Sequence, residues 1–285
     1  DLSEISPEQV WQEFLAQNEL ASSVREQFLP DERPVYAGYV AWRAMLDERE
    51  VPPAIHKEIF EHYAYCLPPG ELFLGYPVPG RDNETEPGRR AYNIVWYRPT
   101  HPDRLADICT DATGKSHGTS IPPPLVRPDV VAWIRGEARA LVAPQVAEIF
   151  ERDPRPFFQP IFDLDTPRIV SGRVALLGDA AFLMRPHPGA GTTKAALDAA
   201  YLADAIAAHG LDDGLQCYQH VQGAFGSGIV RQGRIDGSYL TDQLKPREQR
   251  RNKDISWAVD DLMRDHDGRS AAVLKIFNES RRMAE

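Results

Sequence analysis

The chain has 285 residues, 42% hydrophobic and 26% charged, which is typical of a globular protein of one or two domains and not of a disordered chain. Its formal net charge of −10 argues against a nucleic-acid partner, because binding to phosphates needs concentrated lysine and arginine. No apolar run approaches the roughly 20 residues that cross a bilayer, so we expect no membrane partner. The three scattered cysteines fit neither a disulfide framework nor a zinc site, and no secretory signal opens the sequence. We therefore expect a cytoplasmic protein.

The first expected element is an amphipathic helix over residues 6–28. Ser6 fits the N-cap, Pro7 the first helical position, and Gln9 completes a capping box. One apolar stripe at helical spacing follows: Val10, Trp11, Phe14 and Leu15. A stripe this apolar is not stable in water, so we expect it to cover apolar surface and to favour a homo-oligomer.

Residues 35 to about 100 change to strand patterning. The expected elements are a strand over 35–43, a short helix over 54–63, and two strands over 71–79 and 91–97 that form a hairpin. In the first strand, alternation places Tyr39, Ala41 and Arg43 on one face.

The middle of the chain is expected to be a loop followed by a broken helix. Residues 110–128 are rich in glycine and proline, and helical periodicity resumes over 128–150. Pro144 should break or kink that helix, because proline lacks the backbone donor that the helix interior needs. A strand over 157–163 is expected next.

The most regular unit of the sequence covers residues 172–209. Residues 172–179 are predicted as a buried strand, 185–191 as an irregular turn, and 192–209 as a helix that ends at Gly210. The tail from residue 228 onward is charged and has a helical pattern.

Three short motifs that would indicate other functions fail. Thr193 stands where a phosphate-binding loop needs glycine before its lysine, and the residues before Ser227 do not form a hydrolase elbow. His56 and His62 are too far apart to hold a metal from one helical face, so we interpret them as surface or interface histidines and expect no metal site.

The residues around the turn at 185–191 can form a polar site. Asp179 directly follows the predicted strand, and the helix that starts at Thr192 offers unpaired backbone N–H groups and the positive end of its dipole. Two interpretations remain open. Asp179 binds hydroxyl groups of a ligand, or it only caps the turn while the glycines satisfy the backbone geometry.

These residues resemble a known family. Residues 178–191, G-D-A-A-F-L-M-R-P-H-P-G-A-G, and 198–203, D-A-A-Y-L-A, are similar to the second flavin motif of FAD-dependent aromatic hydroxylases. That motif runs G-D-A-A-H, then P-x-x-G-x-G-x-N, then D-A-x-x-L-A. The segments 30–43 and 75–81, with Asn93 and the pair at 96–97, resemble the branch that contains 2,6-dihydroxypyridine hydroxylase. The resemblance covers residues 22–240.

The sequence also departs from the family pattern. It contains no G-x-G-x-x-G, the motif that holds the pyrophosphate of the ADP half of FAD. Of the middle motif G-x-D-G-x-x-S-x-x-R, only Ser22 and Arg25 match, while other residues replace its two glycines and its aspartate: Ala16, Asn18 and Glu19. Phe182 replaces the usual histidine and Thr193 the usual asparagine. We therefore expect a truncated hydroxylase whose isolated chain binds FAD weakly or not at all.

The resemblance implies a fold and a set of site residues. The fold expected is α/β, a mixed substrate-domain sheet beside a partial Rossmann-like FAD-binding layer. Its expected parts are an N-terminal helix (1–32), a substrate-binding sheet domain (33–165), a partial FAD-binding region (166–225) and a helical tail (226–285). The cofactor-binding residues implied are Arg25, Gly178, Asp179, Pro186, Gly189, Ala190, Gly191 and Thr192. The substrate-binding residues implied are Tyr39, Arg43, Tyr76, Asn93 and Trp96, although core packing would also explain these aromatics.

Within the implied site, Asp179 would bind the ribityl chain, Pro186 would shape the turn beside the flavin ring, and backbone groups of 189–192 would face its pyrimidine edge. His187 is the candidate for catalytic proton transfer, and a turn-stabilising histidine is the alternative.

The implied activity is hydroxylation of a small aromatic substrate with FAD as cofactor and NAD(P)H as reductant. A hydroxypyridine is favoured over a simple phenol, because the strand segments resemble the dihydroxypyridine branch. A partner chain that supplies the missing half would complete such an enzyme. The alternative is a non-catalytic descendant that binds a small aromatic ligand or a protein partner.

Overall fold

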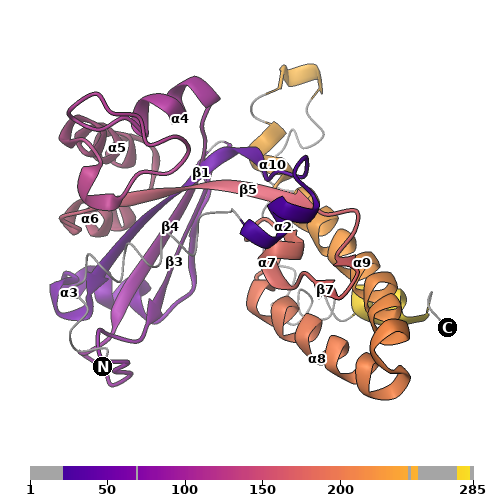
Figure 1. Cartoon of the computed structure of the whole chain (residues 1–285). Helices are drawn as coiled ribbons and strands as arrows, with labels where there is room; N and C mark the ends of the chain where they lie inside the picture. The colour runs from indigo at the N-terminus through magenta and orange to yellow at the C-terminus, as the bar shows by residue number, and fades with distance from the viewer. Residues whose placement is uncertain (1–21, 69, 243–244, 250–274, 283–285) are drawn as a thin grey trace. The chain divides into compact units, whose positions relative to one another are not determined.

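The computed structural model describes residues 22–68, 70–242, 245–249 and 275–282 (Figure 1). These residues form two compact units. Of the described residues, the sheet unit contains 38–68, 70–161, 239–242 and 245–249. The helical unit contains 22–37, 162–238 and 275–282. The predicted helix over 6–28 lies largely outside the described residues, and its last part forms α2 (Ser23–Phe28).

The sheet unit contains the four strands that the sequence predicts and a short further strand, β2, that was not predicted. Its strands follow the order β2-β3-β4-β1-β5, with these bounds: β1 (Val35–Asp47), β2 (Ala64–Cys66), β3 (Leu72–Val78), β4 (Ala91–Pro99) and β5 (Phe157–Asp165). The expected hairpin is confirmed, because β3 and β4 pair antiparallel from Leu72 opposite Tyr97 to Val78 opposite Ala91. The short helix expected over 54–63 is instead α3 (Pro53–Ile55) followed by the π-helical turn η3 (His56–Phe60).

Helices cover one face of this sheet: α4 (Pro102–Ile108), α5 (Pro128–Leu141) and α6 (Pro144–Arg152) (Figure 1). The predicted break is confirmed, since Pro144 opens α6 at a position where its missing N–H costs nothing. Aromatic rings fill the interface. The ring of Trp42 lies 4.9 Å from that of Phe158, and Trp96 meets Phe150 edge-on at 5.9 Å. Burial of such large rings supplies most of the stability of this layer.

Glu48, at the end of β1, is the centre of a buried ion-pair network. Its carboxylate accepts hydrogen bonds from Arg90 at 2.8 and 3.0 Å, and Nε2 of His56 lies 2.9 Å away. Arg90 also bonds Glu61. Among the described residues, Glu48, His56 and Glu61 are close enough to hold a metal ion, but the Arg90 guanidinium already bridges both carboxylates. We therefore describe the cluster as an ion-pair network.

The network predicts a pH dependence of stability. The hydrogen bonds from Arg90 lower the pKa of Glu48 from 4.5 to about 2. A carboxyl whose folded pKa is lowered stabilises the fold above its unfolded pKa, and this contribution is lost as the pH falls towards the folded value. The difference in free energy of unfolding between the wild type and Glu48→Gln should therefore shrink by about 3 kcal/mol from pH 5 to pH 2. Urea titrations at each pH measure this difference, and a pH-independent difference would contradict the prediction.

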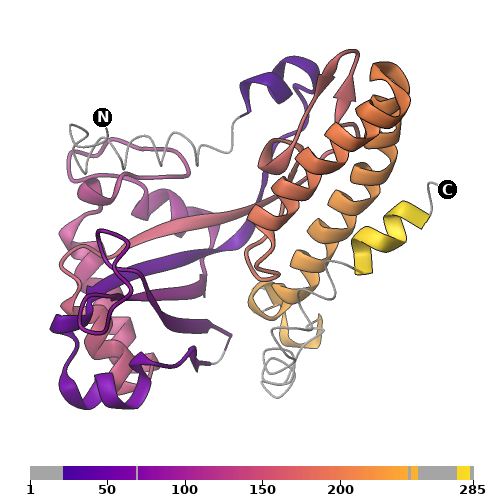
Figure 2. The same cartoon turned by 90° about the horizontal axis from the view of Figure 1, so that it is seen from below.

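The helical unit is dominated by two long helices. The expected helix over 192–209 is confirmed as α8 (Gly191–His209), and α9 (Leu211–Asp236) runs beside it in both views (Figures 1 and 2). The first part of the predicted helical tail thus lies in the second half of α9. Residues 275–282 are also helical, and the ring of Phe277 meets that of Phe225 on α9 at 5.2 Å. None of the described helices combines the length and the apolar character that a membrane crossing requires.

The buried strand predicted over 172–179 is wrong in its extent. The chain forms a two-stranded hairpin of β6 (Val170–Ser171) and β7 (Val174–Ala175), followed by α7 (Gly178–Ala181) and β8 (Phe182–Leu183). Gly172 adopts φ +58°, which makes the tight turn that shortens the strand. Asp179 consequently lies on the short helix α7, and the end of β5 pairs with β8, Leu164 opposite Leu183. The remaining short elements are η2 (Glu48–Glu50), η4 (Pro123–Leu125), α10 (Ser238–Asp242) and η5 (Arg247–Gln249).

The ring of Phe182 packs directly against the backbone of Gly226 in the core of the helical unit. Phe182 is 1% exposed, and a Cβ added to Gly226 on α9 would lie only 2.0 Å from Cδ2 of the Phe182 ring. Ring and helix backbone can approach this closely only because residue 226 has no side chain.

Gly226→Ala should therefore lower the free energy of unfolding by about 2 to 3 kcal/mol, because the added methyl group overpacks the core. Gly136→Ala on α5 is the matched control, since no atom lies within 4 Å of its added Cβ. That variant should be neutral or up to about 1 kcal/mol more stable, owing to the better helix propensity of alanine. Denaturant unfolding of both variants measures the difference, and an equal effect at the two positions would contradict it.

Candidate functional site

Most of the predicted cofactor-binding residues come together at one turn of the helical unit. Nζ of Lys194 on α8 donates to the carbonyl of Gly178, and a Cβ on Gly178 would lie 3.4 Å from that of Ala195. The start of α7 is thus held against the first turns of α8. The N–H of Gly189 donates to the carbonyl of Pro186 at 2.9 Å and closes the turn between them.

The N-terminus of α8 is open. Ala190, its N-cap residue, makes no side-chain capping bond, and Thr192 and Thr193 are exposed. No atom lies within 4 Å of the position that a Cβ would take on Gly189. The N–H groups of the first helical turn can therefore bind an electron-rich edge of a ligand.

Asp179 lies exposed on α7. Partial desolvation by the surrounding turn still raises the pKa of its carboxyl, while the charge of Lys194 opposes the rise and that of Asp198 adds to it. A carboxyl in this position can accept hydrogen bonds from ligand hydroxyl groups. The turn thus fits the polyol chain and the pyrimidine edge of a flavin, and it offers no second cradle for a pyrophosphate.

Arg25 reaches the same turn but lies beneath it. Its residue is 2% exposed, and its guanidinium donates to the carbonyl of Ala180 at 3.4 Å. Ser22 caps α2 by accepting a hydrogen bond from the N–H of Arg25. Burial lowers the pKa of Arg25. The matching part of the middle motif therefore supports the backbone of α7.

Lys194 is buried, with 1% of its surface exposed. Its Nζ donates to Oδ2 of Asp198 at 2.6 Å and to the carbonyl of Gly178 at 2.9 Å. The ammonium group therefore points away from the helix N-terminus, where a phosphate would bind, which agrees with the failed phosphate-loop motif. Sequence reasoning did not identify this pair, although a lysine and an aspartate four residues apart on a helix were the available signal.

A second ion-pair cluster anchors the turn to β5 and α9. Asp163 is 3% exposed and accepts hydrogen bonds from Nε of Arg185 at 2.8 Å and from Arg234 at 2.6 and 3.0 Å. Arg185 directly precedes Pro186 and the half-buried His187. Sequence reasoning missed this cluster, because its members are 22 and 71 residues apart and no local pattern links them.

In the sheet unit, four of the five predicted substrate residues share one face. Tyr76 pairs directly with Asn93, and Tyr39 and Arg43 alternate onto the same side of β1. Tyr39 is fully buried, whereas Arg43, Tyr76 and Asn93 are half-buried. Nε of Arg43 donates to Gln159 at 3.2 Å.

The fifth predicted substrate residue, Trp96, does not share that face. Trp96 pairs with Trp42, so its side chain lies on the opposite, helix-covered face. There its Nε1 donates to Oε2 of Glu71 at 2.7 Å. Neighbouring residues of a strand point to opposite faces, so a substrate on the Arg43 face cannot touch the Trp96 ring.

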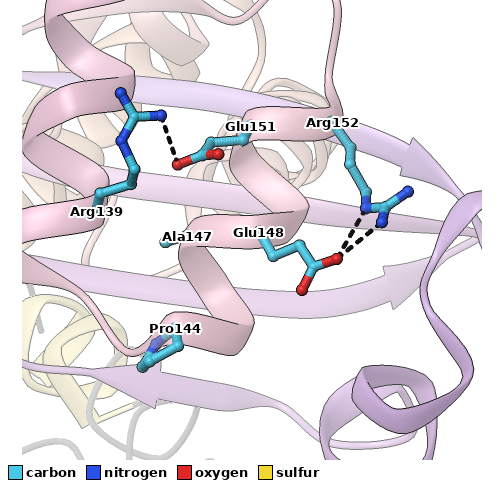
Figure 3. Close-up of a pocket in the computed structure, with 6 residues that line it drawn as sticks. All are labelled: Arg139, Pro144, Ala147, Glu148, Glu151 and Arg152. Carbon is cyan, nitrogen blue, oxygen red and sulfur yellow. Dashed lines mark hydrogen bonds and ion pairs between the residues drawn. The ribbon is translucent and has the colours of Figure 1, made fainter.

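A surface hollow between α5 and α6 holds none of the predicted site residues (Figure 3). Its charged side chains pair with one another, Arg139 with Glu151 at 3.0 Å and Arg152 with Glu148 at 2.8 Å. No charged group in this hollow is left to bind a ligand, so we do not consider it a functional site.

Comparison with known proteins relates the chain to flavin-dependent enzymes. A family model described as FAD binding domain-like matches residues 36–163, which run from β1 to β5. 2,6-Dihydroxypyridine 3-monooxygenase of Paenarthrobacter nicotinovorans is 34% identical over 200 residues, which cover 70% of this chain and 49% of that protein. Salicylate hydroxylase of Pseudomonas putida is 26% identical, over 60% of this chain and 36% of that protein.

Comparison of the folds also relates the chain to a hydroxylase of this kind. The solved structure of 2,6-dihydroxypyridine-3-hydroxylase from Arthrobacter nicotinovorans matches with a TM-score of 0.71 and 30% identity, over 78% of this chain and 56% of that one. The chain spans about half the length of the curated relatives it matches. With residues similar to the second flavin motif at 178–203 and the strands of the sheet unit both present, the chain is similar to FAD-dependent aromatic hydroxylases over about half of their length.

Proposed function

We propose that this chain carries the flavin-facing and substrate-facing parts of an aromatic-ring monooxygenase that uses FAD and NAD(P)H. The observation that carries the proposal is the turn around Asp179, where an exposed carboxyl lies beside the open N-terminus of a helix of 19 residues. Residues 166–225 would bind the flavin, and the sheet of 33–165 would bind the substrate.

Each part of the turn has a role in this proposal. Asp179 would accept hydrogen bonds from the ribityl hydroxyls, and the N–H groups of 191–193 would hold the pyrimidine edge, where the helix dipole favours negative charge. The turn from Pro186 to Gly189 lies beside the ring, and His187 is the candidate for moving a proton. Bound FAD supplies the redox and oxygen chemistry that no side chain can supply.

The substrate class proposed is a hydroxypyridine. Arg43 and Asn93 offer a cation and an amide on one face of the sheet, with the ring of Tyr76 beside them. An ionised hydroxypyridine carries delocalised negative charge and a ring nitrogen, which these donors can hold in one orientation. The names of two relatives, 2,6-dihydroxypyridine 3-monooxygenase and 6-hydroxynicotinate 3-monooxygenase, support this class.

The complete activity also needs a part that binds the ADP half of FAD. We propose that a further polypeptide segment or a partner chain provides it, since the chain contains no G-x-G-x-x-G and matches about half of its relatives. A second copy of this chain cannot supply that motif, so self-association alone would not restore the cofactor site.

Asp179→Ala tests the flavin site directly. FMN contains the ring, the ribityl chain and one phosphate, so it probes this turn without the adenosine part. We expect the variant to bind FMN about tenfold more weakly, because it loses hydrogen bonds between a carboxylate and the ribityl hydroxyls. Titration followed by amide NMR shifts measures affinities in this weak range.

Asp204→Ala on α8 is the matched control, because Asp204 is also an exposed aspartate of the helical unit and lies outside the turn. Its FMN affinity should equal that of the wild type. An equal loss in both variants would mean that net charge, and not the turn, governs binding.

A further inference from the structure

One pair of side chains holds both backbone groups of Gly178. The carbonyl of Gly178 accepts a hydrogen bond from Nζ of Lys194 at 2.9 Å, and its N–H donates to Oδ2 of Asp198 at 2.9 Å. Lys194 and Asp198 also bond each other at 2.6 Å and lie one helical turn apart on α8. Gly178, with φ +56°, is the residue directly before Asp179.

Burying this charged pair opposes folding more strongly than a purely structural contact would. Both side chains are 1% exposed, and taking two charges out of water opposes folding. Oδ1 of Asp198 is buried without a hydrogen-bond partner among the described residues, while Oδ2 accepts both bonds. The ammonium group lies 5.1 Å from the centre of the Phe182 ring, which partly stabilises its charge. Two apolar side chains would fill the same volume without these costs, but they could not hold the backbone of residue 178.

The position of the pair links two segments of the flavin site. Lys194 lies in the first turn of α8, directly after the N–H groups of 191–193, and its bond to Gly178 fixes the start of α7. The direction of the Asp179 side chain is thereby set relative to the open end of α8. If Gly178 were free to rotate, a ribityl chain and a pyrimidine edge could not be held at once by these two segments.

We propose that the buried Lys194–Asp198 pair is the positioning element of the flavin site, which aligns Asp179 with the N-terminus of α8 by fixing both backbone groups of Gly178. This inference rests on the proposed function for its ligand. The pair acts through the backbone of Gly178, and neither of its side chains touches the flavin.

Hydrogen exchange of the Gly178 amide tests the positioning step without any ligand. In the wild type this N–H should be protected. In Asp198→Leu and in Lys194→Met/Asp198→Leu, which remove the acceptor of this N–H, its protection should fall at least tenfold, while the amides of Tyr218 and Ile229 in the core of α9 keep theirs. The double variant leaves no unpaired buried charge, so it provides the result if the single variant does not fold. Lys115→Met and Asp204→Asn, at exposed positions, are the charge-matched controls.

Flavin titration tests whether the alignment serves Asp179. Lys194→Met and Asp179→Ala should each weaken FMN binding about tenfold, and the combined variant should lose no more than either single variant, because both changes remove the same contact. Lumiflavin lacks the ribityl hydroxyls, so these variants should bind it as the wild type does.

Unchanged protection of the Gly178 amide in both Asp198 variants would overturn the proposal, as would additive losses of FMN affinity. If the wild type shows no FMN-induced shifts at residues 178–193, the proposed function fails. In that case the exchange of the Gly178 amide still decides whether the pair holds the turn.

Discussion

Asp163→Ala is expected to lower the free energy of unfolding of the helical unit by about 3 to 5 kcal/mol, because it removes one partner from a buried ion-pair cluster. The Asp163 carboxylate is 4% exposed and accepts hydrogen bonds from Arg185 and Arg234. Without it, the guanidinium of Arg185, which is 12% exposed, keeps its charge in a largely buried position. Urea unfolding followed by circular dichroism measures the loss.

Asp179→Ala is the control for this prediction, because Asp179 is an exposed aspartate of the same unit. Its effect on stability should be within about 0.5 kcal/mol. Asp163→Asn should fall between the two, since an amide oxygen still accepts one of the hydrogen bonds. If Asp163→Ala costs no more than Asp179→Ala, the cluster does not anchor the turn.

Arg43→Ala should weaken binding of an ionised hydroxypyridine by about 10- to 100-fold in the protein completed with its ADP-binding part and FAD. A hydrogen bond to a charged group contributes about 1.5 to 3 kcal/mol, which corresponds to that range. Affinity for a neutral analogue of the same ring should change far less, because only the charged interaction is lost. Calorimetric titration of both ligands measures the two ratios.

Gln159→Ala is the matched variant, because it removes the neighbour that accepts a hydrogen bond from Nε of Arg43 and leaves the guanidinium in place. It should keep most of the preference for the charged ligand. Equal losses for both ligands in Arg43→Ala would show that Arg43 supports the fold and does not bind the substrate.

The strands and the long helix could be predicted because local signals determine them. Alternation over 35–43, the turn-rich segment between β3 and β4, and Pro144 each act within a few residues. The segment 172–179 was misjudged because a short apolar run does not show where it pairs. Its outcome depends on Gly172, whose turn folds the run back as a hairpin with β6.

The candidate site was predictable only where a motif is contiguous in sequence. Gly178, Asp179 and the residues 189–192 were placed in one turn by the motif, and the structure brings them together through α7 and α8. Sequence reasoning did not separate Trp96 from Asn93, although the two lie three residues apart in one strand and alternation places them on opposite faces. The ion pairs of Asp163 and the hydrogen bonds of Lys194 and Asp198 to Gly178 join residues far apart in the chain. A single sequence does not show such contacts.

Titration of the isolated chain with FAD and with FMN tests the central claim, that the chain carries the flavin-facing half of the cofactor site. The account predicts dissociation constants well above 1 µM for both, equal within about threefold, because the adenosine part finds no partner here. Amide shifts should be confined to residues near the turn of 178–193. Submicromolar binding of FAD, or shifts that leave this turn unperturbed, would contradict the account.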